Sequence, residues 1–183
     1  MSAIAAQQPQ HQPEQSAPLN LLALTDTATL QHSILQPTLD YLGVTCQRTS
    51  QLLLGTLLCT ARLAGTKRAD QAIGPYGISA QLHTHLWDDY LALQPELASR
   101  VRGLASQHCF LRDPHAELGY NLAYATAIAW LIYQSQQLQL PKRCDLASLA
   151  RIWETSYPHR GGHASDFLNA WRQAFPCRSK TAR

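Results

Sequence analysis

The feature that most constrains the fold is a short loop in which two glycines and a proline surround one tyrosine. It reads Gly74-Pro75-Tyr76-Gly77-Ile78 and follows Asp70-Gln71-Ala72-Ile73. Glycine opens backbone angles that other residues avoid, and proline fixes one angle, so this loop can turn sharply and approach a ligand closely. The pattern upstream predicts a buried helix over residues 51–64. Downstream, Ser79 is expected to cap an amphipathic helix over residues 79–93.

The segments before and after this unit also have helical patterns. Asp26 or Thr27 is expected to start a helix that runs to about residue 41, with a bend or interruption at Pro37. Pro95 is expected to open another helix, which continues to about residue 108. Both segments carry apolar residues at helical spacing on one face, which is expected to point inward.

The second half of the chain is predicted to hold the hydrophobic centre. Asp113, followed by Pro114, is a strong helix start, and the helix should run to about residue 136 while being apolar nearly all round. Asp145 and Ser165 are expected to cap the last two helices. No segment alternates polar and apolar residues with a period of two, so the predicted class is all-α, with one long buried central helix.

Length and composition predict one domain with short tails. Of 183 residues, 45% are hydrophobic, which is enough for an ordinary core. Residues 1–18 are rich in Gln, Pro, Ala and Ser and are predicted to be a disordered tail. Residues 19–177 form the predicted helical domain, and residues 178–183 form a basic C-terminal tail.

Charge and cysteine content limit the partners. The net charge of +3 comes from scattered basic residues with no interleaved aromatic residues, so no nucleic-acid partner is expected. Five cysteines at irregular spacing, without a C-x-x-C pair, indicate neither a full disulfide framework nor a zinc knuckle. His159 and His163 with Cys144 or Cys177 could form a zinc site, but a plain exposed turn is the favoured interpretation. The sequence therefore predicts no metal, no cofactor and a reducing compartment.

Location follows from two absent patterns. Residues 1–18 have no basic region followed by an apolar region, so no secretory signal is predicted and synthesis is expected to leave the protein in the cytoplasm. Delivery to the periplasm or incorporation in a phage particle stays open. The most apolar run, residues 118–133, is too short for a bilayer and is interrupted by polar residues and glycine, so no membrane span is predicted.

Several weak motifs occur in a characteristic order. Leu-Leu-Leu-Gly-Thr ends at Thr56 and precedes the glycine loop, and His83-x-x-x-Trp87-x-x-Tyr90-Leu91 follows it. Later segments read Asn121-Leu122-x-Tyr124-Ala125-Thr126-Ala127-Ile128, then Ile152-Trp153-x-x-x-Tyr157 and Phe167-Leu168-x-x-Trp171. Over roughly residues 45–175 this order resembles lysozyme-like, transglycosylase-type domains of bacteriophages and prophages.

The resemblance implies a glutamate near the end of the helix that precedes the loop. In the family it protonates the glycosidic oxygen of a peptidoglycan strand, and the loop forms the wall of the cleft beside it. Matching Leu54-Gly55-Thr56 places Thr60 at the glutamate position, and Gly77 stands where a glutamine is usual. A threonine hydroxyl is too weak an acid for this task. The implied function is a peptidoglycan-directed domain that holds a glycan strand with weak or no cleavage.

The candidate site residues follow from this match. Asp70 is the one acid in the loop, so it is a weak substitute for the missing glutamate, and the competing interpretation is a solvated loop aspartate. The residues expected to bind substrate are Gly74, Tyr76, Gly77, Ile78 and Tyr124. Aromatic faces suit the C–H surface of a sugar, although helical aromatic residues commonly belong to the core. Tyr76 leads because it lies in the loop.

Two alternatives stay open. Cys59 with His83 or His85 as base would form a cysteine nucleophile, against the interpretation of Cys59 as a small buried hydrophobic residue. The second alternative concerns the whole protein: a structural or adaptor protein of a phage particle, or of a secretion or conjugation apparatus, that keeps the scaffold without the chemistry. Whether the protein is an enzyme is therefore open.

Overall fold

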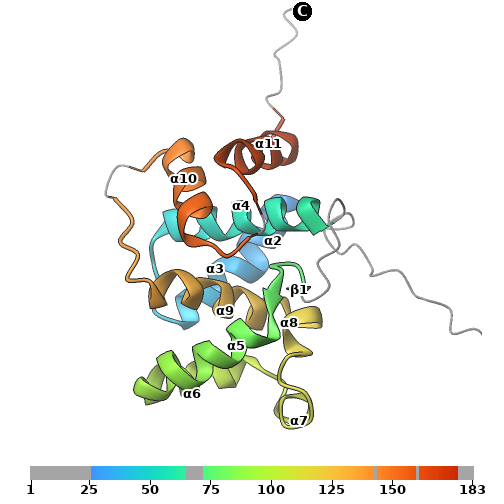
Figure 1. The fold of residues 1–183 in the computed structure, drawn as a ribbon, viewed down its shortest axis with the longest axis vertical. Helices are drawn as coiled ribbons and strands as arrows, with labels where there is room; N and C mark the ends of the chain where they lie inside the picture. The colour runs from blue at the N-terminus through green and yellow to red at the C-terminus, as the bar shows by residue number, and fades with distance from the viewer. Residues whose placement is uncertain (1–25, 65–71, 142–143, 160, 177–183) are drawn as a thin grey trace, which may run out of the picture.

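The computed structural model describes residues 26–64, 72–141, 144–159 and 161–176, and these residues are mostly helical. The predicted all-α class is confirmed. Two helices cross the middle of the molecule in Figure 1, α4 (Gln47–Ala64) and α9 (Leu122–Ser135). Above them in that view lie α10 (Leu146–Ser156) and α11 (Ala164–Ala174), and below them lie α5 (Ala80–His85) and α6 (Pro95–Leu104).

The predicted central helix is α9, in which every residue from 124 to 133 is buried. Its extent differs from the prediction, because the helix is interrupted at Asn121. The short helix α8 (Glu117–Tyr120) lies before this interruption. Asn121 leaves the helical region (φ −102°, ψ 93°), and its Oδ1 accepts a hydrogen bond from the Tyr124 amide at 3.0 Å. The amide side chain thus starts a new helix, so the prediction of one helix from residue 113 was wrong.

The N-terminal segment confirms the cap and the interruption. Asp26 accepts a hydrogen bond from the Thr29 amide, and α2 (Thr27–Leu30) follows it. The π-helical turn η1 (Gln31–Leu35) then leads into α3 (Gln36–Tyr41), whose first turn contains Pro37. Since proline has no backbone N–H and its ring crowds the preceding turn, a change of helix type is expected just before it.

Between α4 and α5, residues 72–79 form a short β-hairpin whose strands are two residues long and whose loop is Gly74–Gly77. β1 (Ala72–Ile73) and β2 (Ile78–Ser79) pair antiparallel, and the Gly77 amide donates to the Gly74 carbonyl at 3.0 Å. Both glycines have left-handed backbones, with φ of 69° and 62°. Ser79 caps α5 as predicted, accepting from the Leu82 amide at 3.2 Å. The helix continues through the π-helical η2 (Leu86–Tyr90) and the 3₁₀ turn η3 (Leu91–Leu93).

Of the last two predicted caps, one is confirmed. Asp145 accepts from the Ser148 amide at 2.8 Å and starts α10. The prediction of Ser165 was wrong, because α11 begins earlier, with His163 as its cap and Asp166 bound to the His163 amide at 2.8 Å. This reciprocal pair satisfies the first free amides of the helix. The helix predicted from Pro95 to about residue 108 is also divided in two. Helix α6 ends at Leu104, and α7 (Gln107–Phe110) is a separate short helix.

Helices α10 and α11 pack tightly on α4. A Cβ placed on Gly55 would lie 1.9 Å from the ring of Phe167, so only a glycine lets α11 approach this closely.

Among the described helices, none combines the length and the apolar character needed to cross a bilayer.

Candidate functional site

Thr60 and the glycine loop are direct neighbours. Thr60 is half-buried near the end of α4, and a Cβ placed on Gly77 would lie 2.7 Å from its Cγ2. On the other side of the loop, a Cβ on Gly74 would lie 1.8 Å from the carbonyl oxygen of Leu118. The two glycines therefore let the loop fit between α4 and α8, with the residue at the predicted acid position against it.

Tyr76 supports the loop from inside the protein. It is 1% exposed, its hydroxyl lies 3.1 Å from the Thr126 hydroxyl on α9, and its carbonyl accepts from the Tyr157 hydroxyl at 2.9 Å. Burial raises the pKa of Tyr76 well above its usual value. Ile78 is equally buried. In this position the Tyr76 ring cannot stack on a ligand at the surface, so any contact with a sugar must come from other residues.

The other two candidate residues lie elsewhere. Tyr124 has no exposed surface, and its hydroxyl lies 2.7 Å from His83 Nε2 and accepts from Trp87 Nε1 at 3.0 Å. It belongs to a polar cluster beneath α5 and, like Tyr76, offers no face to a sugar. Asp70, the proposed substitute acid, falls outside the described residues.

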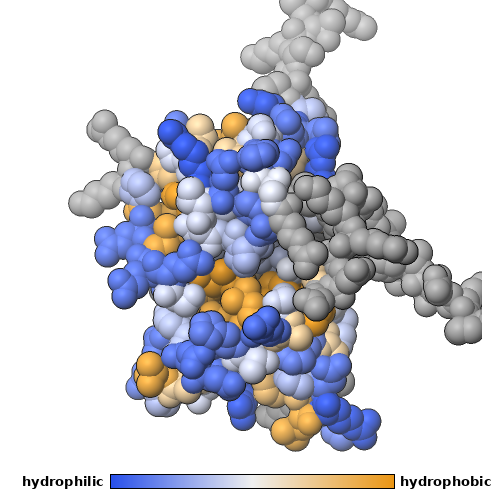
Figure 2. Space-filling view, in the orientation of Figure 1, coloured by the Kyte–Doolittle hydropathy of each residue, from blue (hydrophilic) through white to orange (hydrophobic). Residues whose placement is uncertain are grey.

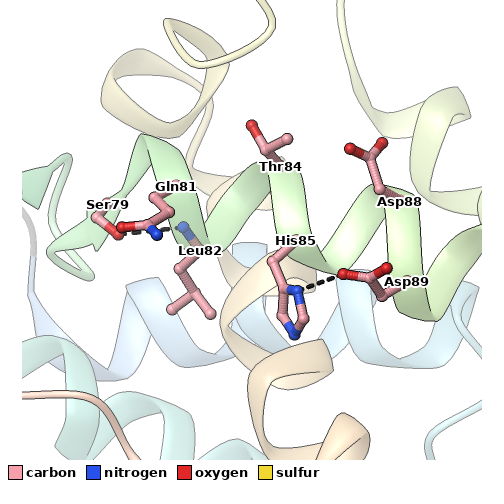
Figure 3. Close-up of a pocket in the computed structure, with 7 residues that line it drawn as sticks. All are labelled: Ser79, Gln81, Leu82, Thr84, His85, Asp88 and Asp89. Atoms are coloured by element: carbon pink, nitrogen blue, oxygen red, sulfur yellow. Dashed lines mark hydrogen bonds and ion pairs between the residues drawn. The ribbon is translucent and has the colours of Figure 1, made fainter.

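A surface hollow of about 580 Å³ begins where the loop ends, and we call it the α5 groove. Figure 3 shows its lining side chains along the helix, with Leu82 and His85 on one side and Thr84 and Asp88 on the other. Its members are Ser79, Gln81, Leu82, Thr84, His85, Asp88 and Asp89. Figure 2 shows apolar residues gathered at the middle of the visible face, between the region of α5 and that of α10 and α11.

The chemistry of the α5 groove is polar with one apolar patch. His85 and Asp89 form an ion pair one helical turn apart, and both side chains are exposed. Amide, hydroxyl and carboxylate groups beside a leucine suit a ligand that carries both hydroxyls and C–H faces. The groove therefore presents hydrogen-bonding groups and one apolar patch, with no Phe, Tyr or Trp side chain among its lining residues.

Cys59 is not placed for nucleophilic chemistry. Its side chain is 1% exposed, and burial, reinforced by the nearby charge of Asp166, raises the pKa of the thiol to about 12. A thiolate is required for attack, so this cysteine is inert near neutral pH. The Asp166 carboxylate is itself bound to the backbone of α11, so it is a capping group. The interpretation of Cys59 as a small buried hydrophobic residue fits these contacts.

A second hollow, of about 510 Å³, lies against the same helix, and we call it the Trp87 pocket. It shares Thr84 and Asp88 with the α5 groove. Its other lining residues are His83, Trp87, Leu91, Ala92, Pro95, Ala98, Arg102, Phe110, Pro114 and His115. These come from α5 through α7 and from the turn before α8.

A hydrogen-bonded cluster forms the floor of the Trp87 pocket. His83, 1% exposed, lies with Nδ1 2.9 Å from Nδ1 of His115 and with Nε2 3.1 Å from Nε1 of Trp87. Burial, and then the neighbouring His115, lower the pKa of His83 to about 4. The ring is therefore neutral at physiological pH. In the described part of the chain, no group of three or more His, Cys, Asp or Glu side chains is arranged to hold a metal ion.

The sequence prediction missed this cluster and a buried carboxylate beside it. Glu117 has no exposed surface and accepts hydrogen bonds from the Ser106 amide, the Tyr120 hydroxyl and the Asn121 side chain, at 2.8 to 3.0 Å. The available signal was the spacing of His83 and Trp87, which puts two polar rings on the same helical face.

Comparison of the chain with protein-family models, curated proteins and solved structures finds no match. The resemblance to lysozyme-like domains therefore stands on the sequence motifs alone. What the protein does must be argued from its site.

Proposed function

We propose that this protein is a lysozyme-like domain that holds a glycan strand of peptidoglycan and does not cleave it efficiently. The observation that carries the proposal is the contact between Thr60 and Gly77. By the motif match, these positions correspond to the acid and the cleft wall of the family. Here they lie against each other with an alcohol in place of the acid.

The missing acid explains why cleavage is not expected. Glycosidic cleavage requires a proton donor whose pKa lies near the working pH, and an alcohol is far from that range. Asp166 is the acid whose charge reaches Cys59, one residue before Thr60, but its carboxylate is held by the α11 cap. Asp166 is therefore not free to replace the glutamate at this end of α4, and Asp70 lies outside the described residues.

Binding is assigned to the α5 groove. It starts at Ser79, directly after the loop, and its exposed polar groups match the hydroxyl and acetamido groups of a glycan. Tyr76 and Tyr124 act indirectly, because they hold the loop and α5 in place from the core. In this assignment, the affinity for the glycan comes from hydrogen bonds and not from aromatic stacking.

Retention on insoluble peptidoglycan tests the binding. Asp89→Ala should weaken retention about tenfold if its carboxylate binds glycan hydroxyls, as expected for a lost charge-assisted hydrogen bond. Asp40→Ala is the matched control, because Asp40 is also exposed and also pairs with a residue one helical turn away, Gln36. Equal retention of both variants and the natural protein would move binding away from this groove.

Cleavage is tested separately in a zymogram. The natural protein should leave peptidoglycan intact, and Thr60→Glu should produce measurable clearing, whereas Thr155→Glu, an exposed helical control, should not. Strong clearing by the natural protein would contradict the proposal.

The alternative is a structural or adaptor protein that keeps the helical scaffold, and the substitution at Thr60 favours it equally. Its partners would be proteins of a phage particle or of a secretion or conjugation apparatus. The retention assay distinguishes the two functions. If the natural protein does not bind peptidoglycan at all, the adaptor function replaces the glycan-binding one.

A further inference from the structure

The Trp87 pocket holds a preorganised arginine with no carboxylate partner among the described residues. The Arg102 guanidinium lies 5.4 Å from the ring centres of both Trp87 and Phe110, and those two rings lie 5.5 Å apart, edge to face. The guanidinium thus stands over the junction of the two rings. Such contacts hold a guanidinium by its faces and leave its N–H edges available.

The polar cluster adds a second donor to this pocket. The Trp87 Nε1–H can only donate, and it points at both His83 Nε2 and the Tyr124 hydroxyl oxygen. His83 Nε2 must therefore be unprotonated, so the His83 proton is on Nδ1 and is donated to Nδ1 of His115. Because Nδ1 of His115 accepts this hydrogen bond, the N–H of the His115 ring is at Nε2, where it is available as a hydrogen-bond donor.

The geometry also explains why the two histidines are not a metal pair. The Nδ1 atoms are 2.9 Å apart and the ring centres 5.1 Å, so the two nitrogens lie nearly on the line that joins the rings. A hydrogen bond is linear in this way, whereas two ligands of one ion converge on it at an angle. His83 therefore donates a hydrogen bond to His115. The pair supplies a hydrogen-bond donor to the pocket and does not form a metal site.

Most of the remaining wall is apolar, apart from Thr84 and Asp88. Leu91, Ala92, Pro95, Ala98 and Pro114 line the pocket together with the two aromatic rings. An arginine fork and an imidazole N–H are the donors that a carboxylate takes, and the apolar walls suit an organic group attached to it. A multiply charged phosphate fits less well, because Asp88 also lines the pocket and contributes a negative charge.

We propose that the Trp87 pocket binds a small organic carboxylate with an apolar side, through Arg102 and His115. The volume of about 510 Å³ falls in the range that such ligands occupy. Asp88, which forms no ion pair with a described residue, is placed to accept a hydrogen bond from an ammonium group on the ligand. Free apolar amino acids and simple arylalkyl acids both carry a carboxylate, and the test below distinguishes these two classes of ligand.

The test uses ¹⁵N-labelled full-length protein and follows the indole N–H signal of Trp87, identified with Trp87→Phe. We expect 3-phenylpropionate to shift this signal in a saturable way. L-phenylalanine should bind more tightly than 3-phenylpropionate, because Asp88 can accept a hydrogen bond from its ammonium group; equal or weaker binding would overturn the role of Asp88. Phenethylamine, which has no carboxylate, should not bind. Saturable binding of phenethylamine, or no shift with either acid, would overturn the proposal.

The variants connect the binding to Arg102. Arg102→Gln should weaken binding of 3-phenylpropionate by about tenfold or more, as the loss of a charge-assisted hydrogen bond predicts. Arg151→Gln, at an exposed arginine of α10, should leave it unchanged. Arg102→Lys keeps the charge without the planar fork and should fall between the two; it also decides the matter if the glutamine variant does not fold. Unchanged affinity in a folded Arg102 variant would refute the site, whereas the glycan assays would be unaffected.

Discussion

His83 should make the stability of this protein depend on pH in the mildly acidic range. Its pKa in the folded protein is about 4, whereas the ordinary value is 6.5. Between these values the unfolded chain binds a proton at this residue and the folded protein does not. Since protons favour the state that binds them, the stability that comes from neutral His83 is lost as the pH falls from 6.5 toward 4.

The size of the effect follows from the two pKa values. With 6.5 unfolded and about 4 folded, linkage predicts that lowering the pH from 7 to 5 reduces the free energy of unfolding by about 2 kcal/mol. The full loss below pH 4 would be about 3 kcal/mol on the same values. The physical cause is the burial of the His83 ring, followed by the neighbouring His115. A proton on His83 Nε2 would also oppose the Trp87 N–H and prevent Nε2 from accepting a hydrogen bond from the Tyr124 hydroxyl.

Urea unfolding followed by circular dichroism at pH 7 and pH 5 measures this difference. Because other groups also titrate between these values, the quantity of interest is the difference between the natural protein and His83→Gln. The natural protein should lose about 2 kcal/mol more than the variant on this change of pH. His85→Gln, at an exposed histidine two residues away, should behave like the natural protein. Parallel pH dependence of the natural protein and His83→Gln would refute the reasoning.

Two further predictions concern buried groups. Glu117→Gln should cost about 1–3 kcal/mol of stability in the same urea assay, because one of the three donors around the carboxylate would face an NH₂ group, while exposed Glu96→Gln should cost little. In native protein at pH 8, Cys59 should not react with a thiol reagent that labels exposed Cys46, so Cys59→Ser should reduce the label count only in denaturant; a lower count in the native state would show that Cys59 is accessible.

Local chemistry explains which parts of the fold the sequence predicted. The caps at Asp26, Ser79 and Asp145 and the interruption near Pro37 depend on a side chain and the backbone within four residues of it, so they were visible in the sequence. The break at Asn121 was less visible. Its amide serves as a cap while it also bonds to the Leu104 carbonyl, and that partner lies 17 residues away in the chain.

The role of Tyr76 was not predictable from its neighbours. A tyrosine in a loop is expected at the surface, where its hydroxyl finds water. Here the ring is buried because Thr126 on α9 provides a partner for the hydroxyl, and Tyr157 binds the backbone carbonyl of the same residue. These partners are 50 and 81 residues away, so only the fold reveals that the burial costs no hydrogen bond.

The Trp87 pocket shows the same limit for a binding site. His83 is buried and His85 is exposed, since residues two apart on a helix face different directions; the helical pattern predicted the divergence but not which of the two is buried. It could not show that His83 meets His115, 32 residues later, or that Arg102 lies over two aromatic rings. Each residue alone has an ordinary role in a helix or turn. The donors for a ligand arise from their combination, because the obligatory Trp87 donor fixes the proton on His83, and that proton in turn fixes the one on His115.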